Sequence, residues 1–334
     1  MFWSPIPTTD LYFLNSCHQL VSSYPWQCFD KSKPIKRLGD NTFQCGTKVL
    51  VVRRDKEKLL KSIINNTALE LIYLIDDNIW QAKNDTSLPE GYKSRLNDFA
   101  CGMASQLINK ASLVVVSNKN LITSLPQNKV TAYLHPIWDG VPPSDLHFNN
   151  TEIKLVHLGT NSHLAGFEFC YPIIERLLTK YNHVTFSYYS NRPLMGQLDN
   201  HPRVKRTKVM RWAKYKKHFK HLSAPEECFH LAIYPIIDTP INSSRSINKI
   251  LETSLVGCAG VYSKSWNYAQ YIKHGTNGLI LDNNAKRWID EISTLIETPG
   301  TLHTLYQGSV ANFNQLNSHH EQLRFWQQHF VGTV

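Results

Sequence analysis

Short apolar segments alternate with longer amphipathic segments along most of this 334-residue chain, and this alternation restricts the fold more than any other feature. The apolar segments have the length and composition of buried strands, whereas the longer ones repeat apolar residues at helical spacing. This order predicts parallel sheets with helices on both faces. In the first half, the sequence predicts strands over 47–52, 69–75, 111–117 and 130–134, and helices over 59–65, 92–109 and 119–124.

A segment rich in proline, glycine and polar residues, 139–150, interrupts the alternation and is typical of a linker. The chain length suits two domains of about 150 residues each. We therefore expect an α/β chain with two doubly wound domains, 1–145 and 151–317. After the linker, strands are predicted over 153–158, 183–189, 230–234, 259–262 and 278–281, and helices over 167–181, 246–255, 268–274 and 285–297.

Charge and composition limit the partners and the compartment. Lysine and arginine total 36 against 26 aspartate and glutamate, a net charge of +10 that favours anionic partners such as nucleotides, phospholipid surfaces or nucleic acid. No apolar run reaches the roughly 18 residues of a membrane span, and the first residues lack the layout of a secretory signal. The seven cysteines are scattered without a C-x-x-C pair. We therefore expect a cytoplasmic protein with reduced thiols and no metal site.

Several common catalytic and nucleotide-binding motifs are missing from the sequence. No G-x-G-x-x-G follows a predicted strand, and neither a G-x-x-x-x-G-K-[ST] loop nor a G-x-S-x-G elbow occurs. Open α/β sheets bind their ligands at the carboxyl ends of their strands. Candidate site residues are therefore sought in the turns that follow the predicted strands.

The turn 158–163 follows the first strand of the second half. Gly159 lets the backbone approach a ligand closely, and the Thr160 hydroxyl and the His163 imidazole can donate hydrogen bonds to a phosphate. The alternative interpretation is an ordinary strand-to-helix turn with a polar helix cap.

A second candidate lies at 240–252, where a predicted strand leads into a helix. The free N–H groups at a helix N-terminus, with Arg245, Ser246 and Lys249 beside them, are typical of an anion site. Glu252 lies three residues after Lys249, on the same helix face, and can accept hydrogen bonds from a ribose diol. The alternative is a capped amphipathic helix that carries a Lys249–Glu252 surface pair.

The second half resembles the donor-binding domain of GT-B glycosyltransferases, and bacterial group-1 (family-4-like) enzymes in particular. The resemblance covers about 150–300, through a strand–Gly-Thr turn at 159–160 and a late G-x-N-G-L turn at 275–279. Between them lies a helix of pattern N-x-x-[KR]-S-x-x-K-x-x-E. Ser244 stands where retaining members place a further glutamate. The helix pattern is matched by Asn242, Arg245, Ser246, Lys249 and Glu252.

The resemblance implies a GT-B fold, in which two Rossmann-like domains face each other across a cleft. Residues 151–317 would bind the nucleotide-sugar through Gly159, Thr160, Ser244 and the helix pattern. Residues 1–145 would hold the acceptor, and a last helix within 318–334 would cross back onto them. We expect sugar transfer from a nucleotide-activated donor to a carbohydrate or lipid-linked acceptor, in surface polysaccharide or lipopolysaccharide synthesis, without a metal or other cofactor.

Two adjacent carboxylates, Asp76 and Asp77, follow the strongly apolar strand 69–75 and are candidate catalytic residues, together with His163. A carboxylate at that sheet edge can accept the proton of an attacking hydroxyl or orient it. The alternative is that both aspartates are turn residues before Ile79 and Trp80.

The segment 203–220 supports a different class of function. It holds nine lysines and arginines in 18 residues, interleaved with Trp212, Tyr215 and Phe219. This composition suits single-stranded nucleic acid or anionic membrane headgroups, and it also fits a solvated basic helix whose aromatic rings pack inward. A GT-B epimerase or a catalytically silent homologue is a further alternative, because the fold alone does not fix the activity. Of these partners we favour peripheral contact with an anionic membrane, and we expect no nucleic acid.

Overall fold

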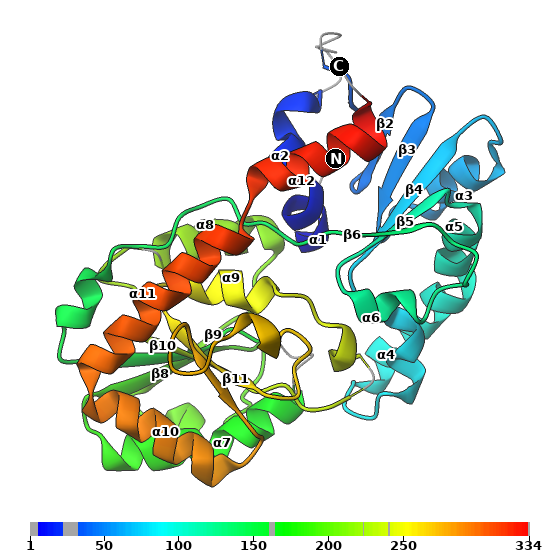
Figure 1. Ribbon diagram of the computed structural model, residues 1–334. Helices are drawn as coiled ribbons and strands as arrows, with labels where there is room; N and C mark the ends of the chain where they lie inside the picture. Colours follow the sequence, from blue (N-terminus) through cyan, green and yellow to red (C-terminus); the bar gives the residue numbers. More distant parts are fainter. Residues whose placement is uncertain (1–5, 23–32, 160–163, 223, 240, 333–334) are drawn as a thin grey trace.

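Two six-stranded sheets lie side by side, each with helices packed on it (Figure 1). The structure is a computed structural model and describes residues 6–22, 33–159, 164–222, 224–239 and 241–332. The first sheet has the order β1-β2-β3-β4-β5-β6, antiparallel from β1 to β3 and parallel from β3 to β6. Its strands are β1 (Lys36–Arg37), β2 (Thr42–Cys45), β3 (Lys48–Val52), β4 (Glu70–Ile75), β5 (Leu113–Val116) and β6 (Thr131–Tyr133).

The second sheet is parallel throughout and has the order β12-β11-β10-β7-β8-β9. From β7 the chain adds β8 and β9 on one side and then β10, β11 and β12 on the other, so the direction of strand addition changes between β7 and β10. Sheets of this kind bind ligands in the crevice at the carboxyl ends of the two strands where the direction changes. Its strands are β7 (Ile153–His157), β8 (Val184–Tyr189), β9 (Val204–Thr207), β10 (Leu231–Tyr234), β11 (Ala259–Ser263) and β12 (Leu279–Leu281).

Several helices of the first part bury apolar residues against the first sheet. In α3, for example, Leu60 and Ile63 lie one turn apart and are buried, as the apolar stripe of an amphipathic helix requires. The helical elements here are α1 (Pro7–Thr9), η1 (Asp10–Leu14), α2 (Asn15–Cys17), η2 (His18–Leu20), α3 (Glu57–Asn65), η3 (Ile79–Asn84), α4 (Glu90–Phe99), η4 (Ala100–Ala104), α5 (Ser105–Lys110) and α6 (Lys119–Ile122).

Helices also surround the second sheet, and the last of them leave it. No helix in the described ranges is long and apolar enough to cross a membrane. The helical elements are η5 (Asp145–Asn149), α7 (Leu164–Lys180), η7 (Gly196–Asn200), α8 (Trp212–Leu222), η8 (Asn242–Ser244), α9 (Asn248–Leu255), η9 (Ala269–Tyr271), α10 (Ala285–Glu297), α11 (Pro299–Leu316), α12 (His319–Trp326) and η10 (Gln327–Val331).

The helix α12, red in Figure 1, packs against the N-terminal helices, which are blue. The indole Nε1 of Trp326, a fully buried side chain, donates a 2.7 Å hydrogen bond to the Tyr12 carbonyl. Gln322 is also buried and donates to the Leu11 carbonyl at 3.0 Å. The last helix therefore supplies part of the core beside the first sheet, although α11 lies on the second.

The chain passes between the sheets twice, and the two crossing segments are joined to each other. The Trp138 amide donates to the Asn317 side-chain oxygen at 2.7 Å, and the Asn317 amide group donates to the Trp138 carbonyl at 3.0 Å. The His319 ring nitrogen Nε2 lies 3.0 Å from the same carbonyl. These reciprocal contacts hold the two crossings side by side.

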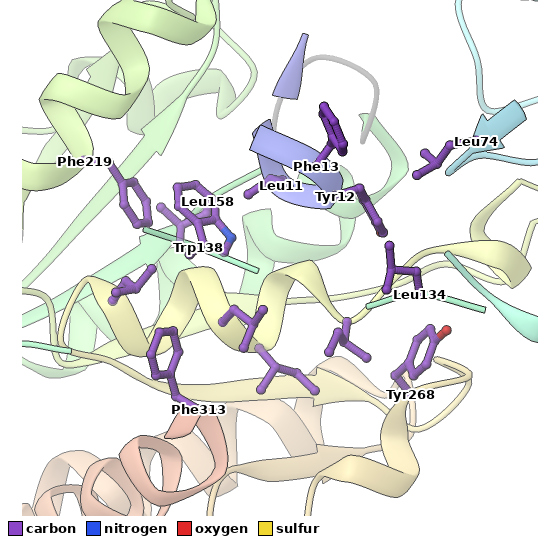
Figure 2. Packing of buried hydrophobic residues seen from close by; sticks show 14 of the residues in the cluster. Leu11, Tyr12, Phe13, Leu74, Leu134, Trp138, Leu158, Phe219, Tyr268 and Phe313 are labelled. Carbon is purple, nitrogen blue, oxygen red and sulfur yellow. The ribbon is translucent and has the colours of Figure 1, made fainter. Parts of the chain in front are cut away.

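One apolar cluster contains residues from both sheets (Figure 2). It joins Leu74 of β4 and the N-terminal Tyr12 and Phe13 to Leu158, which follows β7, and to Phe219 of α8. Figure 2 shows Trp138 beside Leu158 and Phe219. Because apolar burial dominates the free energy of folding, this shared cluster holds the two sheets together.

Two segments differ from the sequence-based expectation. The helix predicted over 268–274 is wrong: only the short turn η9 forms there. Its tyrosines face the first sheet, where the Tyr268 hydroxyl donates to the Ser117 carbonyl at 2.9 Å and lies 3.1 Å from the Tyr133 hydroxyl. The basic segment 203–220 is not one helix, because it forms the edge strand β9 before α8 begins.

Candidate functional site

Arg53 lies between two aspartates at the carboxyl edge of the first sheet. It follows β3 directly, and Asp76 and Asp77 follow β4, which pairs with β3 in parallel. Its Nη1 lies 3.2 Å from Asp76 Oδ1 and 2.9 Å from Asp77 Oδ2. Among the described residues, Arg53 is the one non-glycine with a positive φ, 58°. The Tyr73 hydroxyl donates to its carbonyl at 2.9 Å, so the surrounding structure holds this strained conformation in place.

The second sheet brings two cations to the same place. Arg245, which follows η8, lies with Nη1 3.3 Å from Asp77 Oδ1, so Asp77 is shared between both sheets. The Nε of Arg245 donates to the Asn242 side-chain oxygen at 3.2 Å, which orients the guanidinium. Lys249, in the first turn of α9, donates from Nζ to the Leu158 carbonyl at 2.7 Å.

These groups line a cavity of about 410 Å³ between the two sheets. The first part of the chain supplies the aspartates and the second part supplies Arg245 and Lys249, and Arg245 contacts Asp77 directly. The Thr8 hydroxyl donates to Asp76 Oδ2 at 2.7 Å from the N-terminal helix. The other lining residues are Pro7, Leu11, Tyr12, Arg53, Tyr92, Leu158, Tyr234, Ser246 and Asn248.

The two aspartates differ in their affinity for protons. Burial raises the pKa of Asp76, and the charge of Asp77 raises it further, whereas Arg53 acts in the opposite direction. Burial also acts to raise the pKa of Asp77, but Arg53 and Arg245 together lower it below its usual value. Adjacent carboxyls whose pKa values are moved apart are typical of acid–base sites, with one group ionised and the other able to exchange a proton.

Glu252 lies beside the cavity and is not among its lining residues. Its side chain is only 3% exposed, and both of its oxygens have partners. The Tyr215 hydroxyl donates to Oε1 at 2.5 Å, and Lys249 Nζ pairs with Oε2. The Lys249–Glu252 contact is thus a buried pair and not the surface pair of the alternative interpretation.

Two further residues of the predicted helix pattern have supporting contacts. Asn242 donates to the Ile237 carbonyl at 2.9 Å while its oxygen holds Arg245. Ser244 is buried, donates to the Ile241 carbonyl and accepts from the Asn78 amide at 3.3 Å. Ser244 therefore contacts the first domain's edge and does not line the cavity.

The predicted glycine turn is described only in part, because Thr160 and His163 lie outside the described residues. Gly159 is buried, and a Cβ atom there would lie 2.3 Å from His157 Nε2, so no larger residue fits. His157 is the last residue of β7, and its Nδ1 lies 2.7 Å from the Ile233 carbonyl oxygen, within hydrogen-bond distance. Burial lowers its pKa to about 4, which keeps the ring neutral.

The aromatic residues of the basic segment pack inward. Phe219 is buried and stacks on Trp138 with ring centroids 4.8 Å apart, and Trp212 stacks on Tyr215 at 5.9 Å. Trp212 Nε1 also donates to Asp10 at 2.7 Å. In the described part of the chain, no group of three or more His, Cys, Asp or Glu side chains could hold a metal ion.

Sequence reasoning missed Arg53 and Tyr215. The position of Arg53 directly after a predicted strand was a usable signal, since Asp76 and Asp77 were found in the same way. Tyr215 gave no such signal, because its contact with Glu252 joins residues 37 positions apart and depends on the path of α8.

No protein-family model matches this sequence, and no curated protein is significantly similar to it. The fold, however, is shared with solved structures. HepE from Anabaena, in complex with UDP and glucose, superposes with a TM-score of 0.57 at 18% identity, covering 84% of this chain and 76% of that one. Sucrose-phosphate synthase from Thermosynechococcus elongatus gives 0.58 at 10% identity, covering 78% of this chain and 67% of that one.

TarM superposes with a TM-score of 0.57 at 15% identity, covering 79% of this chain. This chain spans about half of TarM, 51% of its length. At these identities the likeness concerns the fold. Together with the two mostly parallel sheets, it confirms the predicted class, a two-domain Rossmann-like α/β chain.

Proposed function

We propose, from the premise that this chain has the GT-B fold, that it is a glycosyltransferase. It would move a sugar from a nucleotide-activated donor to a carbohydrate or lipid-linked acceptor, with surface polysaccharide synthesis as its expected setting. One observation supports this most directly. In the cavity between the sheets, the cations Arg245 and Lys249 of the second sheet face Asp76 and Asp77 of the first.

The two cations suit the leaving side of the reaction. Negative charge accumulates on the departing diphosphate in the transition state, and cations fixed nearby stabilise it more than they stabilise the ground state. Asn242 and the Leu158 carbonyl already orient Arg245 and Lys249. We propose that these side chains supply the charge a metal ion would otherwise give, so that transfer persists with a chelator present.

The aspartates suit the acceptor side. Asp77 is held ionised by Arg53 and Arg245, whereas the raised pKa of Asp76 makes it the better proton acceptor of the two. Asp76 would accept the proton of the attacking hydroxyl, and Asp77 would orient the cations around it. Closure of the sheets over the donor would exclude water that could otherwise hydrolyse it.

The experiment is a binding screen followed by a transfer assay, both in EDTA. UDP is the first probe, because HepE, which shares this fold, is known in complex with UDP-glucose. GDP, ADP, TDP and CMP follow, each with its sugar conjugates. We expect stabilisation of the chain by one nucleotide, and transfer to an oligosaccharide or lipid-linked acceptor. An epimerase would instead convert the free donor without an acceptor.

Two variants and a matched control connect the result to the cavity. Removing the charge of Lys249 or Arg245 with alanine should weaken nucleotide binding about 10- to 150-fold, because one charge-assisted contact is worth roughly 1.5–3 kcal/mol. Lys264→Ala is the control, since Lys264 is exposed and pairs with Asp282. Equal affinity in all four proteins, or no nucleotide binding in the parent, would contradict the proposal.

A membrane contact is proposed as part of the same function. Lysines of α8 (Lys214 and Lys217), of β9 (Lys205) and of the residue that follows β9 (Lys208) are exposed and make no ion pair among the described residues. Such a surface suits the anionic leaflet on which a lipid-linked acceptor would lie.

A further inference from the structure

Both carboxylate oxygens of Glu252 already have a hydrogen-bonding partner, and the side chain is not among the residues that line the cavity. Its two oxygens bind Lys249 and Tyr215, and the side chain is buried. Glu252 nevertheless lies one turn along α9 from Lys249, which lines the cavity. Because Glu252 is buried and does not line the cavity, a ligand that reached it from the cavity would have to displace a neighbouring side chain, and its two hydrogen-bonding partners are the nearest candidates.

Of the two partners, Tyr215 is the one that a neutral ligand group can replace. Lys249 is a cation on the same helix and is also held by the Leu158 carbonyl. Tyr215 makes a single O–H···O contact of 2.5 Å across from α8. A ribose hydroxyl is likewise an O–H donor, so the exchange would conserve the number and the kind of hydrogen bonds on the carboxylate.

The position of Tyr215 depends on a contact between the two domains. Its ring stacks on Trp212 and packs on Phe219 of the same helix. Trp212 Nε1 and Lys216 Nζ both bind Asp10, a buried carboxylate of η1 beside the first sheet. The N-terminal helix thus fixes α8 in the orientation that places Tyr215 on Glu252.

We propose that the Tyr215 hydroxyl occupies the position of a ribose hydroxyl on Glu252 and that nucleotide binding displaces it. The inference rests on the proposed function, because it concerns the nucleotide of that donor. Tyr215 then lowers the affinity for ribonucleotides, since each binding event must first break the Tyr215–Glu252 hydrogen bond. It also keeps Glu252 paired while no ligand is bound, which avoids the cost of a buried carboxylate oxygen without a partner.

The test compares Tyr215→Phe with the parent, using UDP and 2′,3′-dideoxy-UDP in isothermal titration. GDP and ADP are tested with their dideoxy forms in the same way. Phenylalanine keeps the ring contacts and removes only the hydroxyl. We expect Tyr215→Phe to bind the ribonucleotide about tenfold more tightly and the dideoxynucleotide with unchanged affinity. A fixed structural brace would not distinguish the two nucleotides.

Tyr189→Phe is the matched control. The Tyr189 ring lies 6.1 Å from that of Tyr215, but its hydroxyl contacts His218 at 3.0 Å. This variant should bind both nucleotides like the parent. Glu252→Gln combined with Tyr215→Phe provides a second check, since the selective gain should shrink when the carboxylate is absent.

The outcomes separate the two proposals. Equal ribonucleotide affinity in the parent and Tyr215→Phe, or an equal gain for the dideoxy form, overturns the role of Tyr215 and leaves the proposed function standing. Binding that occurs only after Tyr215→Phe supports both. If neither protein binds UDP, GDP or ADP, both proposals are overturned.

Discussion

At the scale of single residues, the cavity depends on how Arg53 and Arg245 share the charge of Asp77. Arg53 binds both aspartates, whereas Arg245 reaches only Asp77. A diphosphate in the cavity would compete with Asp77 for Arg245. The two aspartates should therefore respond differently to the loss of their charge.

Asp76→Asn should reduce transfer by about 100-fold or more while nucleotide binding stays unchanged, as expected for the loss of a general base. Asp77→Asn should instead raise the affinity for the nucleotide, because Arg245 no longer pairs with a carboxylate and is free to bind the diphosphate. Initial transfer rates and titrations measure the two effects, with Asp290→Asn on α10 as the control. Parental transfer rates in both variants would rule out a role for either aspartate.

Because the pKa of Asp76 is raised, the same prediction implies that the transfer rate depends on pH. A general base works only when ionised, so transfer should fall as pH decreases through the pKa of Asp76, above the usual range of an aspartate. The pH profile of the parent should show this acidic limb. If the residual rate of Asp76→Asn keeps the same limb, another group is responsible for it.

The sequence located these side chains by one physical rule, that polar residues after parallel strands meet at one sheet edge. That rule placed Asp76, Asp77, Arg245 and Lys249 near a common cavity. It could not show that Ser244 faces Asn78 or that Tyr215 binds Glu252, since both contacts depend on how α8 and η8 are packed. Spacing along one helix does not determine contacts between elements.

At the scale of elements, α8 has two distinct faces. Trp212, Tyr215 and Phe219 pack inward, and Lys216 pairs with the buried Asp10. The lysines Lys214 and Lys217 are exposed on the outer face. Lys214 and Lys217 are therefore available to a membrane, whereas Lys216 is held by Asp10.

Charge reversal at Lys214 and Lys217 should release the chain from anionic vesicles without changing nucleotide binding. Each basic residue near such a surface contributes about 1 kcal/mol, and salt screens the attraction. Vesicle sedimentation at low and high salt measures the effect. The control reverses Lys58 and Lys286, which are exposed on other helices. A parent that does not sediment with vesicles, or does so equally at all salt concentrations, contradicts the contact.

The helix α12 makes the last residues part of the first sheet's core. Trp326→Ala should lower the free energy of unfolding by about 3–5 kcal/mol, because a fully buried indole and its hydrogen bond to Tyr12 are lost. Urea unfolding measures the change. Arg324→Ala, an exposed change on the same helix, should cost less than about 0.5 kcal/mol. Similar losses in both variants would contradict this role of α12.

Elements with strong periodicity were predicted well, and elements fixed by long-range contacts were not. The strands β3, β4, β5, β7, β8 and β10 lie where apolar runs predict them. The hairpin β1–β2 and the N-terminal helices lack such runs. The short elements η1 and α2 are held by contacts with Gln322 of α12 and with Ile137, which precedes the linker. Local pattern cannot reveal elements that tertiary contacts stabilise.

At the scale of the whole molecule, two buried histidines and the half-buried His135 make stability depend on pH. Burial lowers the pKa of His135, His157 and His230 to about 4. Below pH about 6.5 the unfolded chain binds protons that the folded chain does not. Stability should therefore fall between pH 6.5 and 4, and each histidine contributes up to about 3 kcal/mol of that loss.

Urea unfolding at pH 7, 6 and 5 measures this dependence. His157→Asn should make the slope shallower, since the Asn amide can replace the Nδ1 contact with the Ile233 carbonyl and does not titrate. His274→Asn is the control, because His274 is exposed. An unchanged slope in His157→Asn would contradict the assignment.

If the two sheets move relative to each other, we expect the pivot at the paired contacts of Trp138 and Asn317, because both crossings of the chain are joined there. In a rotation about such a pivot, residues near it move little and residues far from it move more. In Figure 1 the contact of α6 with η8 lies far from this pivot, and there Asn120 donates to the Ser243 carbonyl at 3.3 Å. Dyes on α6 and η8 should therefore report opening with a large change in separation, whereas dyes flanking Trp138 should report almost none.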